Sequence, residues 1–127
     1  MDLILDTNAL SAMAEGETGI KRQLESSATL SIPVVVLGEY IYGIRQSRNR
    51  LSYERWLASL IRACRILVID EVTAHHYADI RAELKRAGRP IPSNDLWIAA
   101  LARHHNLILL TQDKHFGYIP NLTLASW

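Results

Sequence analysis

The sequence has a single cysteine, Cys64, and therefore no pair that could form an internal disulfide bond. A chain without disulfide bonds suits a reducing compartment. It also lacks a long hydrophobic run, because the longest one, residues 96–102, is far shorter than the roughly 20 apolar residues of a membrane span. A basic leader with a cleavage site is absent too, since a strand-like run follows Met1 and Asp2. We therefore expect a cytoplasmic protein with no membrane partner.

Low-complexity segments and linkers are lacking as well. Of the 127 residues, 49% are hydrophobic and 21% are charged, which is typical of an ordered globular protein. A chain of this length fits one domain and can bury about two-thirds of its unfolded surface. Because no internal repeat divides the chain, we expect residues 1–127 to form a single domain.

An excess of charge of either sign is also lacking, because the formal net charge is +1. The charges are nevertheless unevenly placed: residues 1–44 carry six acidic and two basic side chains, whereas residues 45–65 carry six arginines and one glutamate. A basic flank beside an acidic half is what a ligand with a phosphate backbone requires if the cleavage site is acidic. The alternative is that these arginines form the solvated face of a helix.

Short apolar runs alternate with helical patterns along the chain. The runs typical of buried strands are residues 3–5, 29–32, 66–69, 107–110 and 122–124. Helices are expected over residues 9–14, 18–26, 33–44 with Pro33 first, 49–63, 71–87 after the N-cap Asp70, and 96–105 after the cap Ser93. Continuous apolar strands separated by helices indicate a sheet covered on both faces. The expected fold class is α/β, a three-layer α/β/α sandwich with a mostly parallel central sheet.

Four acidic residues occupy informative positions in this pattern. Asp6 directly follows the first strand, and Asp113 follows the fourth strand after two residues. Glu39 lies about two turns into the third helix, and Asp95 lies in the first turn of the apolar sixth helix. Ligands of open parallel sheets bind beyond the carboxyl ends of the strands, so these carboxylates are expected to converge at one edge.

Carboxylates in apolar surroundings are costly, and several together repel one another. A divalent cation removes both penalties, because hard oxygen ligands suit Mg²⁺ or Mn²⁺. Each acid also has a purely structural interpretation: Asp6 as a helix cap, Asp95 as a partner of the helix dipole, and Asp113 as a turn residue. Glu39 has no obvious partner within the sequence.

Four segments together resemble the PIN domain, and more narrowly the VapC toxins of bacterial and archaeal toxin–antitoxin modules. They are residues 5–8 (LDTN), 38–43 (GEYIYG), 91–100 (IPSNDLWIAA) and 110–116 (LTQDKHF). Each is weak alone, but their order, spacing and the chain length agree with the family. The resemblance implies a Mg²⁺- or Mn²⁺-dependent endoribonuclease that cleaves RNA and inhibits translation. It also implies a homodimer and neutralisation by a small cognate antitoxin protein.

Carried onto this sequence, the resemblance implies a catalytic, metal-binding set of Asp6, Glu39, Asp95 and Asp113. We assign Asp6 and Asp95 as the main ligands of one ion, with Glu39 reaching it directly or through water. Asp113 then helps to hold a second ion or positions the attacking water; the sequence leaves open whether one or two ions act.

Several polar residues near these acids are further candidates. Thr111 and Asn8 match positions that often assist at the site, and Thr111 is placed to bond the attacking water or a carboxylate. Ser93 and Asn94 flank Asp95 and are supporting candidates only. His115 follows Asp113 by two residues and is interpreted as a surface turn residue.

Other functions are less consistent with the sequence. A phosphatase of the haloacid-dehalogenase kind would carry Asp-x-Asp after the first strand, but Asn8 stands at the second position. A catalytically silent PIN-like module that binds RNA or protein should have lost an acid, and a structure-specific DNA nuclease usually has more acids and a helical clamp. The adjacent pairs at 75–76 and 104–105 are the remaining histidines; each pair's rings should point apart, so no zinc site is expected.

Overall fold

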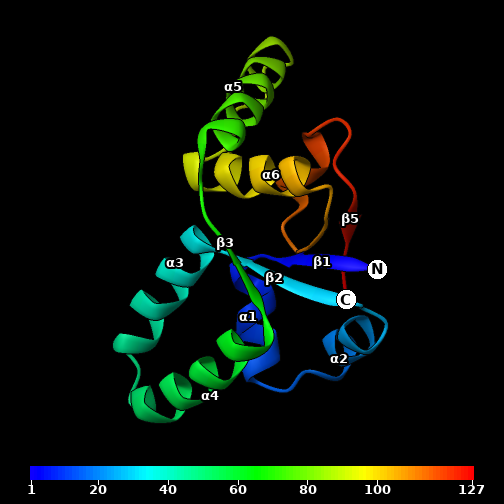
Figure 1. Cartoon of the computed structure of the whole chain (residues 1–127). Helices are drawn as coiled ribbons and strands as arrows, with labels where there is room; N and C mark the ends of the chain where they lie inside the picture. The colour runs from blue at the N-terminus through cyan, green and yellow to red at the C-terminus, as the bar shows by residue number, and fades with distance from the viewer.

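The computed structural model describes all 127 residues and has one five-stranded parallel sheet at its centre (Figure 1). The strands are β1 (Asp2–Leu5), β2 (Thr29–Pro33), β3 (Arg65–Leu67), β4 (Ile108–Leu110) and β5 (Leu124–Ala125). Their order is β3-β2-β1-β4-β5, and every neighbouring pair is parallel. All carboxyl ends of the strands therefore meet at one edge of the sheet.

Helices cover both faces of this sheet. They are α1 (Thr7–Ala14), α2 (Thr18–Glu25), α3 (Val34–Arg45), α4 (Arg50–Ala63), α5 (Glu71–Arg86) and α6 (Ser93–His105), with a short 3₁₀ helix, η1 (Lys114–Tyr118). Figure 1 shows α5 and α6 on one face, and α1, α2 and α4 on the other. The α/β fold with a covered parallel sheet is thus confirmed.

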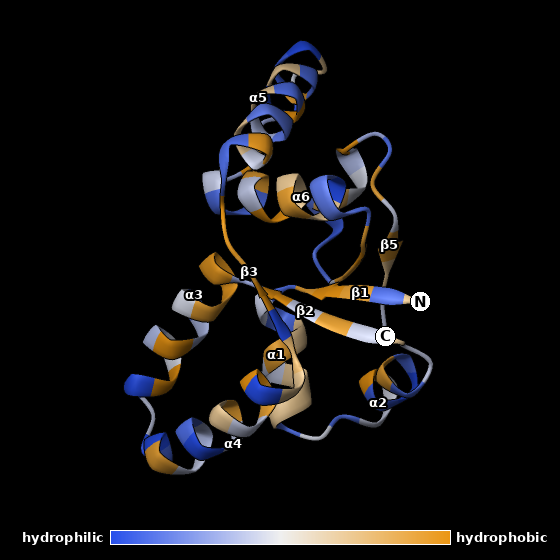
Figure 2. Ribbon diagram, in the orientation of Figure 1, coloured by the Kyte–Doolittle hydropathy of each residue, from blue (hydrophilic) through white to orange (hydrophobic).

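The core forms around the central strand. Leu3, Ile4 and Leu5 of β1 are completely buried, because β1 lies between β2 and β4 and under helices on both faces. Apolar residues follow the strands and the inward sides of the helices (Figure 2). Helix α6 contributes six buried residues, and burying a large aliphatic side chain contributes about 1.5–3 kcal/mol. The helix that carries Asp95 is therefore held rigidly against the sheet.

Helix α5 is fixed at both ends. Its N-cap, Asp70, accepts a hydrogen bond from the Thr73 amide, and the Thr73 hydroxyl approaches the Asp70 backbone in a capping box. Gly88 ends the helix with a φ of 68°, a conformation that favours glycine. The predicted cap at Asp70 and the predicted end at Gly88 are confirmed.

Several predicted element boundaries are wrong. Ser93 is the first residue of α6, and the cap position is held by Pro92, whose fixed φ suits it. Pro33 likewise ends β2 and precedes α3. The third strand stops at Leu67, because Val68 and Ile69 extend beyond the end of β2 and are 62% and 36% exposed. The final strand begins at Leu124, two residues later than expected.

None of the helices combines the length and the hydrophobicity that crossing a membrane requires.

Candidate active site

The site begins where the two central strands end. Leu5 and Leu110 are paired in register, so Asp6 and Thr111, which follow them, lie side by side. The Asp6 amide donates to the Leu110 carbonyl at 3.2 Å, which extends the pairing by one residue. The polar side chains after β1 and β4 therefore meet at the carboxyl edge, as the sequence pattern predicts.

Asp6 has a structural role and a central position at the same time. One carboxylate oxygen accepts from the Thr7 amide at 2.8 Å and caps α1. The other accepts from the Thr111 hydroxyl at 2.7 Å, and the residue is only 6% exposed. The capping interpretation and the site interpretation of Asp6 are thus both compatible with its geometry, because each uses a different oxygen.

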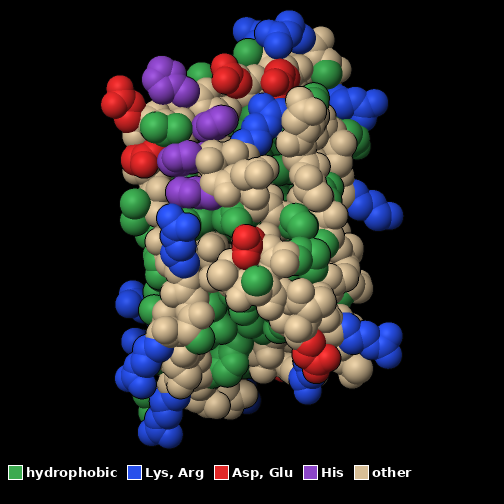
Figure 3. Space-filling model, turned by 45° about the vertical axis from the view of Figure 1, so that its right-hand side comes forward, with side chains coloured by type: hydrophobic (Ala, Val, Ile, Leu, Met, Phe, Trp, Pro, Cys, Tyr) green, Lys and Arg blue, Asp and Glu red, His purple; other side chains and the backbone are tan.

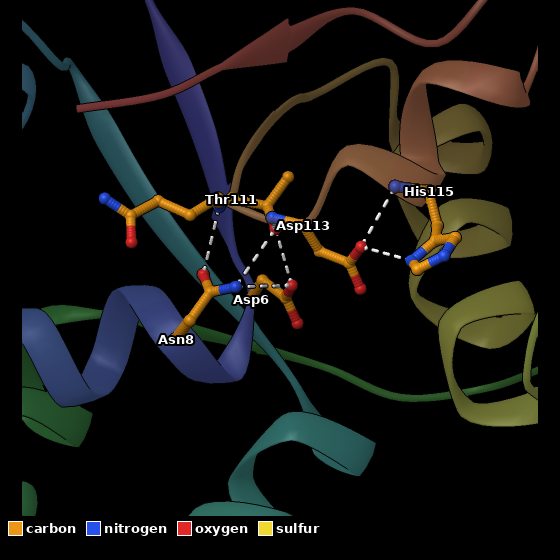
Figure 4. Close-up of polar contacts among 6 residues, drawn as sticks. Asp6, Asn8, Thr111, Asp113 and His115 are labelled. Atoms are coloured by element: carbon orange, nitrogen blue, oxygen red, sulfur yellow. Dashed lines mark hydrogen bonds and ion pairs between the residues drawn. The ribbon is translucent and has the colours of Figure 1, made fainter.

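Asn8 and Thr111 connect Asp6 to Asp113 (Figure 4). The Asn8 amide nitrogen lies 3.4 Å from the Asp6 carboxylate and 3.3 Å from the Thr111 hydroxyl. The Thr111 hydroxyl also accepts from the Asp113 amide at 3.0 Å. This network fixes the start of the loop after β4, so that Asp113 stays close to Asp6.

Glu39 obtains its partners from distant parts of the chain. Its two carboxylate oxygens accept from the Thr7 hydroxyl at 3.2 Å and from the Asn94 amide at 3.0 Å. The side chain is exposed, so the apolar surroundings expected for it are wrong: its face of α3 lies over the site. Because Asn94 precedes Asp95, this hydrogen bond ties α3 to the N-terminal turn of α6.

Asp95 is half-buried, and its carboxylate makes no side-chain hydrogen bond within the protein. Burial, and after it the negative charges of Asp6, Asp113 and Glu39, together raise its pKa from the ordinary value of 3.8 to about 6, against a smaller lowering by His115. Burial also raises the pKa of Asp6, although hydrogen bonds from Thr111 and Thr7 oppose the change. The four predicted acids therefore share one electrostatic environment.

No three acidic, histidine or cysteine side chains are close enough together to enclose a metal ion as they stand. The donor set nevertheless fits Mg²⁺ or Mn²⁺, because it consists of carboxylate oxygens and includes the unpartnered Asp95. Asp6, Asp95, Asp113 and Glu39 are the residues that would hold an ion.

The supporting candidates divide into two groups. Asn8, Thr111 and Asn94 all bond to residues of the site, whereas Ser93 makes no side-chain hydrogen bond and lines a hollow of about 360 Å³ beside α5. Ser93 is thus not brought to the four acids. Sequence reasoning missed the role of Thr7, although it lies inside the first quoted segment, because only the fold places its hydroxyl beside Glu39.

The histidines differ from the sequence-based expectation in two ways: one predicted orientation is wrong, and one contact was not expected. The rings of His104 and His105 do not point apart but stack with centroids 4.1 Å apart, and His104 also approaches the Thr73 hydroxyl at 2.9 Å. His104 also stacks on His76 of α5, with ring centroids 5.9 Å apart. His115, which was interpreted as a surface turn residue, is exposed but has its Nδ1 2.8 Å from an Asp113 oxygen.

Comparisons with known proteins bear on the family of this chain. Residues 3–122 match the family model of the PIN domain. The chain is 30% identical to "Ribonuclease VapC2" of Rickettsia felis over 100% of its length and 98% of the relative. It is 28% identical to the "tRNA(fMet)-specific endonuclease VapC" of Shigella flexneri, again over 100% and 98%.

Solved structures show the same architecture. The crystal structure of VapBC2 from Rickettsia felis, bound to a DNA fragment from its promoter, superposes with a TM-score of 0.90 at 29% identity, covering 100% of this chain and 99% of that one. VapBC-5 of Mycobacterium tuberculosis, a member of the VapBC family of toxin-antitoxin systems, gives 0.77 at 26% identity, with 98% and 96% covered.

Proposed function

Because this chain belongs to the PIN-domain family, and within it to the VapC ribonuclease toxins, we propose that its acidic edge binds Mg²⁺ or Mn²⁺ and hydrolyses RNA. One observation supports the proposal: four carboxylates from four segments lie at the carboxyl edge of a parallel sheet, and burial together with the charges of the other three raises the pKa of the unpartnered Asp95 to about 6. Because carboxylates gathered in one site repel one another, the binding of a divalent cation there is favourable.

A bound divalent cation would activate water and neutralise the charge that develops on the phosphate. The chain's own residues prepare the site for this chemistry. Asp6 is held rigidly by the Thr7 amide and the Thr111 hydroxyl, while Asp95 presents its free oxygens from a buried helix. Asn94 and Thr7 orient Glu39, and the His115 ring orients Asp113. Hydrogen bonds therefore set the positions of three acids, and packing sets the fourth.

Cleavage of a mixed RNA pool by the purified protein tests the proposal. We expect cutting with Mg²⁺ or Mn²⁺, no cutting with EDTA, and none by Asp95→Asn. The matched control is Asp79→Asn, the same change at an exposed acid of α5 that makes no hydrogen bond. A folded, metal-supplied protein that leaves the whole pool intact would contradict the proposal, as would equal cutting by Asp95→Asn.

We further propose that cleavage stops translation and takes place in the cytoplasm, where the RNA substrate is. The arginines that the sequence singled out support an RNA partner: all six of residues 45–65 are exposed. Three of them, Arg48, Arg50 and Arg55, line one hollow of about 470 Å³ at the turn between α3 and α4. Such clusters attract a phosphate backbone.

The proposed protein partner is a small antitoxin whose tail enters the groove between α1, α3 and α4. This groove of about 250 Å³ includes Thr7 and Glu39 at the site and continues past Gly43 to Ser47 and Tyr53. A peptide lying there would cover Glu39 and close the approach to the other acids. Glu15 and Glu39 in its lining favour a tail with a basic side chain.

We also propose a homodimer that forms through an exposed apolar patch. Pro33 and Leu67 are paired in register, so Val34 and Val68 emerge together at the end of β2 and β3. Val68 is 62% exposed, and Ile69 and Val72 beside it are also exposed. Contiguous apolar surface of this kind commonly marks a protein interface.

A further inference from the structure

A line of planar side chains leads away from Asp113. The Nδ1 atom of His115 lies 2.8 Å from the Asp113 carboxylate. The His115 ring meets the Tyr118 ring edge to face, with centroids 6.0 Å apart and planes at 72°. The Arg89 guanidinium then lies 4.4 Å above the centre of the Tyr118 ring. Figure 4 shows that His115 lies on the side of Asp113 away from Asn8.

These planar groups face solvent. The Tyr118 residue is 44% exposed, the His115 side chain is 64% exposed, and Arg89 is exposed. Arg89 forms no ion pair with a carboxylate, and residues 84–94 contain three basic and no acidic side chains. The platform, defined as Arg89, Tyr118 and His115, is therefore cationic and aromatic and borders an acidic site.

The platform is fixed to both flanking acids by short segments. Arg89 lies in the loop that leads directly into α6, which carries Asp95 in its first turn. Tyr118 ends η1, the 3₁₀ helix that Asp113 caps by accepting from the His115 amide at 2.9 Å. Because both segments are anchored at the acids, the platform keeps a constant position relative to them.

We propose that this platform binds an unpaired RNA nucleotide next to the phosphodiester bond that is cut. The base stacks on the guanidinium–phenol pair, and the Arg89 charge binds the neighbouring phosphate. Stacking on aromatic rings and on guanidinium planes is the usual way in which proteins hold single-stranded RNA. The inference rests on the proposed ribonuclease function and assigns to these three residues the binding of a base that is free to leave its stack.

Five variants test this role in cleavage of a labelled pool of short single-stranded RNAs of random sequence. We expect Tyr118→Ala to raise KM about tenfold with little change in kcat, and Tyr118→Phe to restore the wild-type KM, because the phenyl ring still stacks. Arg89→Gln should raise KM and reduce the dependence of binding on salt concentration. The matched controls are Tyr42→Ala, at a 70% exposed tyrosine of α3, and Arg86→Gln, at an exposed arginine near Arg89; neither should change KM.

Two further measurements separate the possible explanations. The affinity of the same RNAs in EDTA, measured by fluorescence anisotropy, should fall by the same factor in Tyr118→Ala, and it reports on the platform even if the wild-type protein cuts nothing. For fully paired RNA, the affinity of Tyr118→Ala should equal that of the wild type. A residue that only fastens the loop to η1 would lower the melting temperature and leave KM and affinity unchanged. That result would overturn the inference, and so would a loss of affinity on paired RNA equal to the loss on single-stranded RNA.

Discussion

At the scale of single residues, the four acids differ in how the protein holds them. Asp6, Glu39 and Asp113 each accept hydrogen bonds from neighbouring groups, which compensate part of the cost of their charge. Asp95 accepts none and is half-buried, so it bears the cost of burial and repulsion without compensation. Its carboxylate is therefore the one whose neutralisation should be most favourable.

Replacement of Asp95 by asparagine should stabilise the metal-free protein. Asp95→Asn removes a charge that burial and three carboxylates disfavour, and we expect the free energy of unfolding at neutral pH to rise by about 1 kcal/mol after allowance for partial exposure. Asp6→Asn should not give this gain, because its amide nitrogen would face either the Thr111 hydroxyl or the Thr7 amide, both of which now donate to Asp6. Urea unfolding in EDTA measures the free energy of unfolding of both variants. If Asp95→Asn is less stable than the wild type, Asp95 is a structural residue.

The same charge predicts how stability depends on pH. In the folded, metal-free protein the pKa of Asp95 is raised to about 6, whereas an unfolded aspartate titrates near 3.8. The folded state thus holds a proton that the unfolded chain releases between these values, and stability falls as the pH rises through this window. The raised pKa of Asp6 acts in the same direction. Between about pH 4 and pH 7, the free energy of unfolding should fall less in Asp95→Asn than in the wild type. An equal fall in both proteins would contradict the raised pKa of Asp95.

Residue-level partners were the least predictable part of the site. Glu39 was singled out because it lacked a partner nearby in the sequence, but its partners lie 32 and 55 positions away. The acids themselves could be located, because three of them stand at fixed distances from the ends of apolar runs. Which oxygen meets which donor depends on how α1, α3 and α6 pack.

At the scale of elements, helix α3 has two functions on two parts of its surface. Its first turns bring Glu39 to the site, and its later turns line the groove that we assign to the antitoxin. Two glycines of this helix, Gly38 and Gly43, have open space where a side chain would begin, so larger residues fit there without disturbing the backbone. Only Gly43 lines the groove.

Gly43→Met should therefore fill the groove and weaken antitoxin binding, while RNA cleavage by the free protein continues. Gly38→Met is the matched control on the same helix and should bind the antitoxin normally. Both changes replace glycine within a helix, so both should stabilise α3 slightly. Co-purification with the cognate antitoxin measures the difference; normal neutralisation of Gly43→Met would place the tail elsewhere.

Most elements were predictable from the alternation of apolar runs and helical patterns, but their limits were not. Ile66 to Ile69 reads as one apolar run, yet the strand ends at Leu67 because its neighbour β2 ends at Pro33, opposite Leu67. The start of α6 was placed too late because Ser93 is a common cap, whereas Pro92 takes that position. Boundaries of this kind are decided by pairing and by competing neighbours, which a local pattern does not contain.

At the scale of the whole molecule, parallel pairing concentrates function at one edge and leaves other surfaces for partners. Figure 3 shows one face of the molecule, on which histidine side chains gather between acidic side chains above them and lysine or arginine side chains below them. The order β3-β2-β1-β4-β5 was not predictable from one sequence, although the convergence of the acids was. The order matters because it makes β3 an edge strand and exposes the apolar patch that follows it.

The proposed dimer follows from that exposed patch. Val68→Asp should place a charge in the interface and yield a monomer at concentrations where the wild-type chain is a dimer. Leu51→Asp is the control, because Leu51 on α4 is 68% exposed and lies outside the patch. Sedimentation velocity measures both. A Val68→Asp protein that remains dimeric, or a wild type that is monomeric throughout, would exclude this interface.

The central claim is that the four acids gather a divalent cation, and calorimetric titration of Mn²⁺ into the metal-free protein tests it most directly. We predict saturable binding to the wild type and to Asp79→Asn, and loss of that binding in an Asp95→Asn protein whose urea unfolding shows that it is folded. Equal Mn²⁺ binding by Asp95→Asn and the wild type, or no binding to either, would contradict the account.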